Sequence, residues 1–427
     1  MNICIFSYFF SPIYPGNGTR YPLILAESLV KDGHKVKVIT AFPQNLDGTV
    51  YKEYRHLFFR REFLNGVELV RVWVPPIKHF GFMKRMILYS SFMISSTIGI
   101  SLVGKTDIIL GTSPEPPFLI IPGFFLNKFK RAPYVLTLGD LWPNNVFDLD
   151  ILNNKLIIEL VKFSTLVSFN LSKNIVVITN SIRTGLLNNG ISSEKVSVVE
   201  LGVDTNCFKS KKKDIELEEG LFNNKFVVMY SGIFGPTYDF DILLKAAKLL
   251  EHLPDILFII RGDGECKEQI VAKISKLSLT NVRVLGPVSN TEKVIDYLNS
   301  ADLFVIPMKN VKVSETAHPS KLFEYLACEK PVICCAKGEL ADLVKTAECG
   351  LVVEPDDCDA LAKSIQILYI DTQKRLEMGK KGRAYVIQNF SYEIIGKKLV
   401  NILKRTFSER SLFSKVLKNN MTDSASK

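Results

Sequence analysis

Short apolar runs alternate with turns and with segments of helical spacing along this chain. Residues 3–6 form an apolar run, residues 11–18 are rich in Gly and Pro, and residues 20–31 have helical periodicity that ends at Gly33. Residues 35–39 then alternate like a second strand. The order strand, helix, strand predicts a βαβ unit, from which open parallel sheets are built.

Further strands are predicted in both halves of the chain. They lie at residues 67–74, 107–110, 134–138, 175–179 and 196–199 in the first half, and at 226–230, 256–260, 282–285, 303–306 and 331–335 in the second. A Gly-bearing loop, residues 231–235, follows the first strand of the second half, and residues 241–250 are helical in pattern. The sequence therefore predicts an α/β protein with two doubly wound Rossmann-like domains that face a cleft, with ligands bound beyond the carboxyl ends of the strands.

The charge pattern suggests where these domains end. Residues 206–224 are charged and lack periodicity, which predicts a linker between an N-terminal domain over residues 1–205 and a C-terminal domain over residues 225–390. Residues 391–427 predict a helix and a basic tail. Basic and apolar residues interleave in this tail, which fits either a membrane-surface segment or a solvated terminus, and both interpretations stay open.

One segment has the composition of a membrane helix. Residues 86–103 carry no charge over 18 positions, which reaches the lower limit for a membrane span. Serine, threonine and glycine dilute the run, so we favour a buried or membrane-touching helix over a span. The N-terminus has neither the basic region nor the cleavage site of a signal peptide, so we expect a cytoplasmic protein.

The overall charge narrows the classes of partner. The chain has 54 Lys and Arg against 44 Asp and Glu, a net charge of +10, which favours nucleic acid, a phosphorylated substrate or an acidic membrane surface. No helix-turn-helix, RNA-recognition or zinc signature accompanies the charge, so nucleic acid is disfavoured. The eight cysteines form no CxxC pair and only five histidines are present, so we expect reduced thiols and no metal site.

The first glycine loop lies between a strand and a helix, where backbone N–H groups can face an anion. Gly16 and Gly18 have the spacing of a dinucleotide fingerprint, but Tyr21 stands where its third glycine belongs. The sequence also contains no G-x-x-x-x-G-K-[ST] motif. A dinucleotide dehydrogenase and a P-loop ATPase are therefore both disfavoured.

Residues 315–328 contain the richest set of polar groups. A loop with His318 and Pro319 precedes a predicted helix that Ser320 is expected to cap, so the helix N-terminus offers a diphosphate site. Lys321 adds a positive charge in the first turn, and Glu324 is placed one turn later to accept hydrogen bonds from ribose hydroxyls. An ordinary capped helix, with a solvated lysine and a paired glutamate, is the alternative.

Two other strand ends carry candidate residues. Asp140 could hold an acceptor hydroxyl or cap a turn, and Trp142 could stack on a sugar or belong to the core. Arg261, Gly262 and Gly264 follow a strand of the second half, where glycines allow the chain to turn close to a ligand. An ordinary strand-to-helix turn explains this last group equally well.

Taken in order, these motifs resemble those of family 4 glycosyltransferases of GT-B fold. The chain is more narrowly similar to the bacterial polysaccharide-assembly branch that includes WbuB-type fucosamine transferases. The resemblance rests on motifs spread over nearly the whole chain: Phe10-Ser11-Pro12, Gly33-His34-Lys35-Val36, Asp140-Leu141-Trp142-Pro143, Tyr230-Ser231-Gly232, Gly262-Asp263-Gly264 and residues 319–327.

The resemblance implies a nucleotide-sugar donor held mainly by the second domain, an acceptor held by the first, and transfer that retains the anomeric configuration without a metal. Asp140, Lys321 and Glu324 match catalytic positions. The matched donor-binding positions are Gly16, Gly18, Gly232, Arg261, Gly262, Gly264, His318, Pro319, Ser320, Lys321 and Glu324. Within this set, Glu324 matches the ribose-binding carboxylate, and the glycines match turns beside the base and phosphates.

The resemblance also implies a substrate class. It favours UDP over GDP, N-acetyl-L-fucosamine or a related amino or deoxy sugar as donor sugar, and a polyprenyl-diphosphate-linked glycan as acceptor. The expected setting is O-antigen or capsule synthesis by an enzyme peripherally associated with the inner membrane. A nucleotide-sugar epimerase of GT-B fold is the alternative enzyme class.

Two positions depart from the family pattern. Thr316 stands where many members have a second glutamate, with Glu315 one residue away. The basic residues that many members place after the strand ending near Gly232 are also absent. The charge of a diphosphate would then fall to Lys321 and Arg261.

Overall fold

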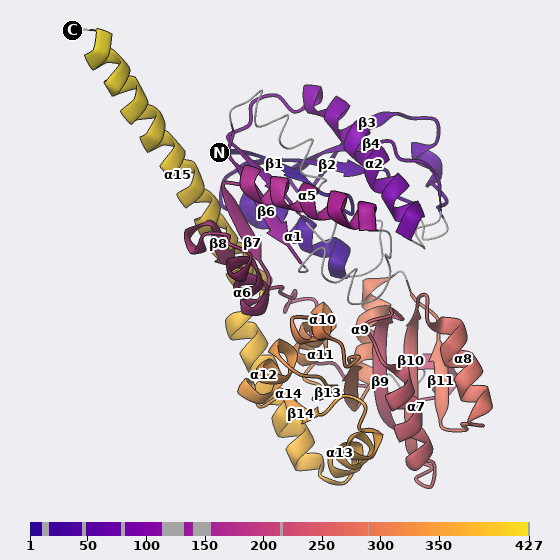
Figure 1. The fold of residues 1–427 in the computed structure, drawn as a ribbon. Coiled ribbons are helices and arrows are strands. Elements are labelled where there is room, and N and C mark those ends of the chain that lie inside the picture. Colours follow the sequence, from indigo (N-terminus) through magenta and orange to yellow (C-terminus); the bar gives the residue numbers. More distant parts are fainter. Residues whose placement is uncertain are drawn as a thin grey trace. The chain divides into compact units, whose positions relative to one another are not determined.

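The computed structural model describes residues 1–10, 17–44, 48–77, 82–112, 132–139, 155–213, 217–288 and 290–425. The chain divides into two compact units. The first unit comprises Met1–Tyr14, Gly18–Glu200 and Ile395–Lys427, and the second comprises Pro15–Asn17 and Leu201–Ile394. Both are α/β units with a central sheet, as the sequence predicted (Figure 1).

The first unit contains a sheet of eight strands in the order β3-β4-β2-β1-β5-β6-β7-β8. Their bounds are β1 Asn2–Phe6, β2 Lys35–Ala41, β3 Phe59–Leu64, β4 Val67–Val72, β5 Ile108–Gly111, β6 Tyr134–Leu138, β7 Asn174–Val177 and β8 Val196–Val198. Strand β3 pairs antiparallel with β4, and the other neighbours are parallel. The described helices of this unit are α1 Asn17–Lys31, α2 Phe82–Gly99, α5 Lys155–Leu171, α6 Asn180–Asn188 and most of α15 Tyr392–Ala425.

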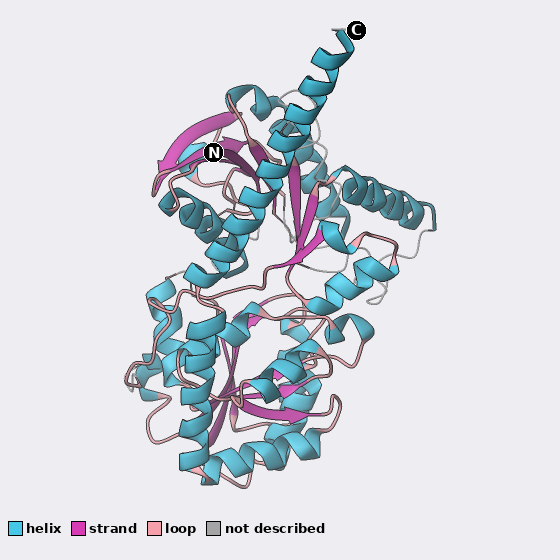
Figure 2. Ribbon diagram, turned by 90° about the vertical axis from the view of Figure 1, so that its left-hand side faces the viewer, coloured by secondary structure: helices cyan, strands magenta, loops and turns pink. Residues whose placement is uncertain are grey.

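The second unit contains a fully parallel sheet of six strands in the order β11-β10-β9-β12-β13-β14. The strands are β9 Phe226–Ile233, β10 Ile256–Asp263, β11 Val282–Leu285, β12 Leu303–Pro307, β13 Val332–Cys335 and β14 Gly350–Val353. Helices cover both faces of this sheet (Figure 2). They are α7 Phe240–Leu249, α8 Lys267–Lys276, α9 Thr291–Ser300, α10 Lys312–Glu315, α11 Ser320–Ala327, α12 Glu339–Thr346, α13 Cys358–Ile370 and α14 Thr372–Asn389.

The strand order of the second sheet locates its ligand-binding edge. The chain runs outward from β9 through β10 to β11, and then returns to the other side of β9 to form β12. The order therefore reverses between β9 and β12, and ligands of doubly wound sheets bind at the carboxyl ends of the strands at such a switch point. Burial on both faces explains why β9 and β10 each begin with a run of five residues without a charge or a small polar side chain.

Two strands were not predicted, and strands β9 and β10 each extend three residues beyond their predicted ends. Strand β3 alternates exposed and half-buried residues at an edge of its sheet. Strand β14, also at an edge, has only four residues, and its apolar run of three is mostly half-buried. Strands β9 and β10 continue to Ile233 and Asp263, where their ends pair in register. The first residues of the predicted glycine loop 231–235 thus belong to the strand.

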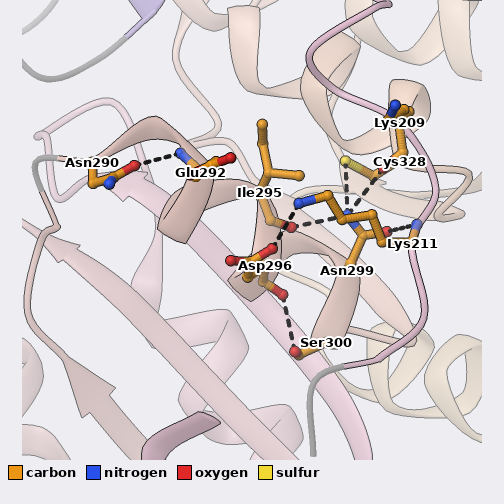
Figure 3. Close-up of polar contacts among 9 residues, drawn as sticks. All are labelled: Lys209, Lys211, Asn290, Glu292, Ile295, Asp296, Asn299, Ser300 and Cys328. Atoms are coloured by element: carbon orange, nitrogen blue, oxygen red, sulfur yellow. Dashed lines mark hydrogen bonds and ion pairs between the residues drawn. The ribbon is translucent and has the colours of Figure 1, made fainter.

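Residues 209–211, near the start of the second unit's long segment, contact helix α9. The buried side chain of Asn299 accepts a hydrogen bond from the Lys211 backbone N–H at 2.7 Å and donates one to the Lys209 carbonyl at 3.1 Å (Figure 3). The Lys211 ammonium also pairs with Asp296 at 2.9 Å. Residues 209–211 are therefore fastened to this unit by both backbone and side-chain contacts.

The uncharged segment 86–103 lies mostly in helix α2. Leu88 and Phe92 are buried in the first unit, whereas Ile94 and Ile98 are exposed. Within the described ranges, no helix combines the length and the apolar character that a membrane crossing requires. All eight cysteines lie in those ranges and are free thiols.

Candidate functional site

Two glycines at the switch point allow strands β9 and β10 to approach closely. Gly232 and Gly262 are partners in the parallel register, and a Cβ atom on Gly262 would lie 1.9 Å from the Gly232 carbonyl oxygen. Gly262 has a φ of +140°, a conformation that other residues rarely adopt. A Cβ on Gly264 would lie 2.6 Å from the Phe234 carbonyl oxygen. These positions require glycine for backbone packing, whatever ligand lies beyond them.

Helix α11 begins beside these strand ends. Its N-cap residue is Pro319, which makes no side-chain cap hydrogen bond with any described residue, and Ser320 is already helical. The prediction that Ser320 caps the helix is therefore wrong by one position. Proline offers no side-chain oxygen, so within the described part of the chain no side chain caps this helix end, and its first N–H groups carry partial positive charge.

Lys321 extends from the first turn of α11 to the end of β9. A Cβ on Gly232 would lie 2.8 Å from the Lys321 ammonium nitrogen, so the missing side chain makes room for this lysine. The ammonium donates a hydrogen bond to the hydroxyl of Tyr230 at 2.6 Å, and it lies 3.8 Å from the centre of the Tyr238 ring. Lys321 is only 9% exposed, and burial lowers its pKa to about 7. The expected alternative of a solvated lysine is thus wrong.

Tyrosine side chains hold the end of β9 in place. The Tyr325 hydroxyl accepts a hydrogen bond from the Ser231 N–H at 3.0 Å and donates one to the Ser231 carbonyl at 2.6 Å. Its ring stacks on Phe304 with centroids 3.7 Å apart. Since Tyr325 belongs to α11 and Phe304 to β12, this contact fixes helix α11 against both strands of the switch point.

The buried side chain of Arg261 also contacts the end of strand β9. Its guanidinium donates to the Ser231 hydroxyl at 2.9 Å and lies 4.5 Å from the centre of the Tyr297 ring. The side chain is 4% exposed, and burial lowers its pKa. Among the described residues, its Nε atom has no hydrogen-bond partner. These contacts hold Arg261 against Ser231 beneath the edge of the sheet.

Glu324 and His318 flank the lysine. Glu324 lies one turn after Lys321 and is half-buried, and its negative charge opposes the burial effect on the pKa of both Lys321 and Arg261. His318 is buried, with its ring 5.1 Å from the Phe323 ring and 6.2 Å from the Phe390 ring. The structure therefore gathers Gly232, Arg261, Gly262, Gly264 and residues 318–324 at one edge of the second sheet.

Four other candidates, Gly16, Gly18, Asp140 and Trp142, belong to the first half of the chain. Gly16, Asp140 and Trp142 lie outside the described residues, and Gly18 lies in the first turn of α1 in the first unit. Thr316 ends helix α10, and its hydroxyl donates to the Val313 carbonyl at 3.1 Å.

Three tyrosines of the site, Tyr230, Tyr238 and Tyr325, were not among the predicted site residues, although Tyr230 and Tyr325 stand in motifs that carry the family resemblance. Tyr230 had one recognisable signal. It is a residue with a polar tip in an otherwise apolar strand, just before a glycine and at the carboxyl end where ligands bind.

Comparison with known families covers nearly the whole chain in two consecutive parts. Residues 18–206 match the family described as Glycosyltransferase Family 4. Residues 211–385 match the family described as Glycosyl transferases group 1, and this part includes every site residue gathered above.

Individual proteins resemble the chain over most of its length. A putative colanic acid biosynthesis glycosyl transferase, WcaI of Escherichia coli, is 25% identical over 384 residues, which cover 86% of this chain and 91% of that protein. Sucrose-phosphate synthase from Thermosynechococcus elongatus has a TM-score of 0.76 at 18% identity and covers 96% of this chain and 99% of its own. Anabaena HepE, solved in complex with UDP-glucose, has a TM-score of 0.69 at 18% identity, with 95% of this chain and 100% of its own covered.

The two structural matches show the fold, and the two family matches assign the sequence to one class of enzyme. This chain belongs to the family 4 glycosyltransferases of GT-B fold.

Proposed function

We propose that this glycosyltransferase moves a sugar, with retention, from a UDP-sugar to a polyprenyl-diphosphate-linked glycan in surface polysaccharide synthesis. The donor sugar is N-acetyl-L-fucosamine or a related amino or deoxy sugar, and the product belongs to an O-antigen or capsule. The enzyme works at the cytoplasmic face of the inner membrane. The similarity to a putative colanic acid transferase and to a fold solved with UDP-glucose supports this substrate class.

The observation that carries the proposal is the position of Lys321. Its ammonium touches Gly232 at the switch point, and it comes from the first turn of a helix whose N-terminus lacks a capping side chain among the described residues. A diphosphate at this edge meets a lysine, the partial positive charge of a helix N-terminus and the exposed backbone of glycine turns. Glu324, one helical turn away, is the group for the ribose hydroxyls.

The reaction breaks the bond between the anomeric carbon and the diphosphate oxygen, and the electron pair stays on that oxygen. Lys321 and the N–H groups of α11 stabilise the negative charge that develops there. The acceptor hydroxyl attacks from the same face, and its proton passes to the departing diphosphate. By the same resemblance, we assign Gly16 and Gly18 to the phosphates and Asp140 to the acceptor.

Lys321 must be protonated to act in this way. Burial lowers its pKa to about 7 in the structure, so at neutral pH the charged form is only partly populated. A bound diphosphate favours the charged form, since an opposite charge within a few ångströms raises the pKa of a lysine. Donor binding is therefore expected to convert Lys321 fully to its protonated, positively charged form.

Calorimetric titration of the purified protein against UDP, GDP and the free nucleosides tests the donor site. We expect UDP to bind without added metal, GDP to bind more weakly, and Glu324→Ala to lose most of the affinity for UDP. Glu377→Ala is a matched control, because Glu377 is an exposed residue of helix α14 and its carboxylate accepts a hydrogen bond from Gln373 of the same helix. Equal UDP affinity in wild type and Glu324→Ala would remove Glu324 from the site.

A transfer assay with a UDP-sugar and a polyprenyl-diphosphate-linked glycan tests the reaction. We expect a product only when the acceptor is present. Release of an altered nucleotide sugar without acceptor would instead identify an epimerase.

A further inference from the structure

Helix α5 of the first unit buries hydroxyl side chains and exposes several large apolar side chains. Thr165 and Ser168 of the helix and Ser172, which directly follows it, face inward and are 3%, 1% and 2% exposed. Its large apolar residues face outward, and Leu160 and Phe163 are 59% and 67% exposed. Surface helices of globular proteins normally show the reverse arrangement.

Five of the exposed apolar residues form one continuous stripe, which we call the outer face of α5: Leu156, Leu160, Phe163, Val167 and Leu171. Their spacing of three or four residues places them on one side of the helix. Leu166, 48% exposed, lies beside this stripe. Two of the inward hydroxyls donate hydrogen bonds to backbone carbonyls of α5. Ser168 donates to the Ser164 carbonyl and Ser172 to the Ser168 carbonyl, both at 2.8 Å.

Helix α2 adds apolar residues on the same side of the sheet. The connections β4-α2-β5 and β6-α5-β7 cross the sheet in the same direction, and right-handed crossovers then place both helices on one face. Ile87, Ile94 and Ile98 of α2 are 51%, 63% and 71% exposed. Exposed apolar surface of this extent marks an interaction site in a soluble protein.

Charge indicates what this surface meets. The first unit, residues 1–14, 18–200 and 395–427, has 29 Lys and Arg against 16 Asp and Glu, or +13. The second unit has 25 against 28, or −3, so the basic charge of the protein resides in the unit that carries the outer face of α5. A two-fold dimer through this face would bring two +13 units together, which disfavours a second copy as the partner.

Lysines also border the stripe itself. Lys155 and Lys162 lie along α5, whose single carboxylate, Glu159, pairs with Lys162 at 2.9 Å. Beyond the helix end, Lys195 donates to the Asn170 carbonyl at 3.1 Å, and the nearby charge of Lys173 contributes, after burial, to its lowered pKa. An apolar stripe bordered by lysines matches the surface of an anionic bilayer, with acyl chains beneath negative headgroups.

We propose that the first unit docks on an anionic lipid bilayer through the outer face of α5, with α2 beside it. Leu160 and Phe163 enter the boundary between headgroups and acyl chains, and the surrounding lysines contact the headgroups. This inference rests on the proposed function in one respect: the lipid-linked acceptor proposed above lies in a membrane, and docking would bring the enzyme to it.

Vesicle co-sedimentation of the full chain tests the proposal. The probes are vesicles of phosphatidylglycerol mixed with phosphatidylethanolamine, and vesicles of phosphatidylcholine alone. We expect binding to the anionic vesicles that weakens with added salt. The double variant Leu160→Gln, Phe163→Gln should bind about tenfold more weakly, since two apolar side chains no longer leave water.

The matched control is Ile370→Gln, Leu376→Gln in the second unit, whose two side chains are 72% and 53% exposed. It should bind vesicles as the wild type does, and both double variants should keep the wild-type circular dichroism spectrum because the changed residues are exposed. Equal vesicle binding by wild type and the α5 variant would overturn the proposal, as would a wild type that does not bind anionic vesicles.

Sedimentation velocity without lipid tests whether a second copy of the chain, rather than a bilayer, covers the outer face of α5. A wild-type dimer that the α5 substitutions convert to a monomer would assign the face to a second copy and overturn the lipid proposal. UDP titration of the same α5 variant separates this inference from the donor site. Unchanged UDP affinity with lost vesicle binding supports both, whereas failure of UDP to bind the wild type would count only against the proposed function.

Discussion

The ammonium nitrogen of Lys321 lies 2.6 Å from the phenolic oxygen of Tyr230, at the carboxyl end of strand β9. The Tyr230 hydroxyl donates its own proton to the Ile233 carbonyl at 2.6 Å, so its lone pairs are left to accept from the lysine. Tyr230 is fully buried. The position of Lys321 is therefore set by the strand end, and Tyr230 is a positioning residue for it.

Removing the Tyr230 hydroxyl tests this role. Tyr230→Phe keeps the ring but leaves the buried ammonium without its acceptor, so we expect UDP affinity at pH 7 to fall about tenfold, or ~1.4 kcal/mol. The free energy of unfolding should fall by about 1–2 kcal/mol. Calorimetry and denaturant unfolding measure the two effects. Tyr369→Phe is the control, since that ring packs on Phe226 at the start of β9. A variant less stable but with unchanged UDP affinity would reduce Tyr230 to a purely structural role.

The buried lysine should also give stability a defined dependence on pH. The pKa of Lys321 is about 7 in the folded protein against 10.5 for an ordinary lysine. Between these values the unfolded chain binds the proton and the folded protein does not, so this group makes the free energy of unfolding rise with pH. The slope is at most ~1.4 kcal/mol per pH unit.

Lys321→Met should lose that contribution. We expect the difference in unfolding free energy between wild type and Lys321→Met to change in favour of the wild type from pH 7 to pH 9, as measured by denaturant unfolding. Lys245→Met, at an exposed position of α7, should follow the wild type. Parallel pH profiles for wild type and Lys321→Met would show that Lys321 keeps an ordinary pKa.

Donor binding should draw a proton from solution. At pH 8 the lysine with a pKa of about 7 is mostly neutral, and a bound diphosphate restores its charge. UDP titrations in two buffers of different ionisation enthalpy measure this uptake. We expect a fraction of a proton for the wild type and none for Lys321→Met. No uptake by the wild type at pH 8 would mean that the diphosphate does not meet Lys321.

The parts of the fold that sequence predicted best are those with continuous apolar burial. Strand β6 has the predicted bounds because all five of its residues are buried and so all are apolar or threonine. Strand β3 escaped prediction because Phe59 and Phe63 are exposed and charged residues lie between them, so its pattern resembles neither a core strand nor a polar loop.

The site was predictable in its location but less so in its contacts. Glycines and a helix start at strand ends pointed to the correct edge, because strand ends of a parallel sheet meet there. The burial of Lys321 could not be read from sequence, since it depends on Gly232 and Tyr230, which lie in another strand. Likewise, Ser320 looked like a cap because the local pattern cannot show that Pro319 already holds that position.

The close approach of β9 and β10 gives the last prediction. In Gly262→Ala the new Cβ would lie 1.9 Å from the Gly232 carbonyl oxygen and 3.1 Å from the Phe234 ring, at a φ of +140°. The strand ends must separate, so we expect the free energy of unfolding to fall by about 3 kcal/mol. UDP binding should also weaken, because the Lys321 ammonium packs next to Gly232. Gly286→Ala is the control. A Cβ there has no neighbour within 4 Å, so its stability should stay within about 1 kcal/mol of wild type. If denaturant unfolding found Gly262→Ala as stable as Gly286→Ala, the two strand ends would not be in contact as the structure shows.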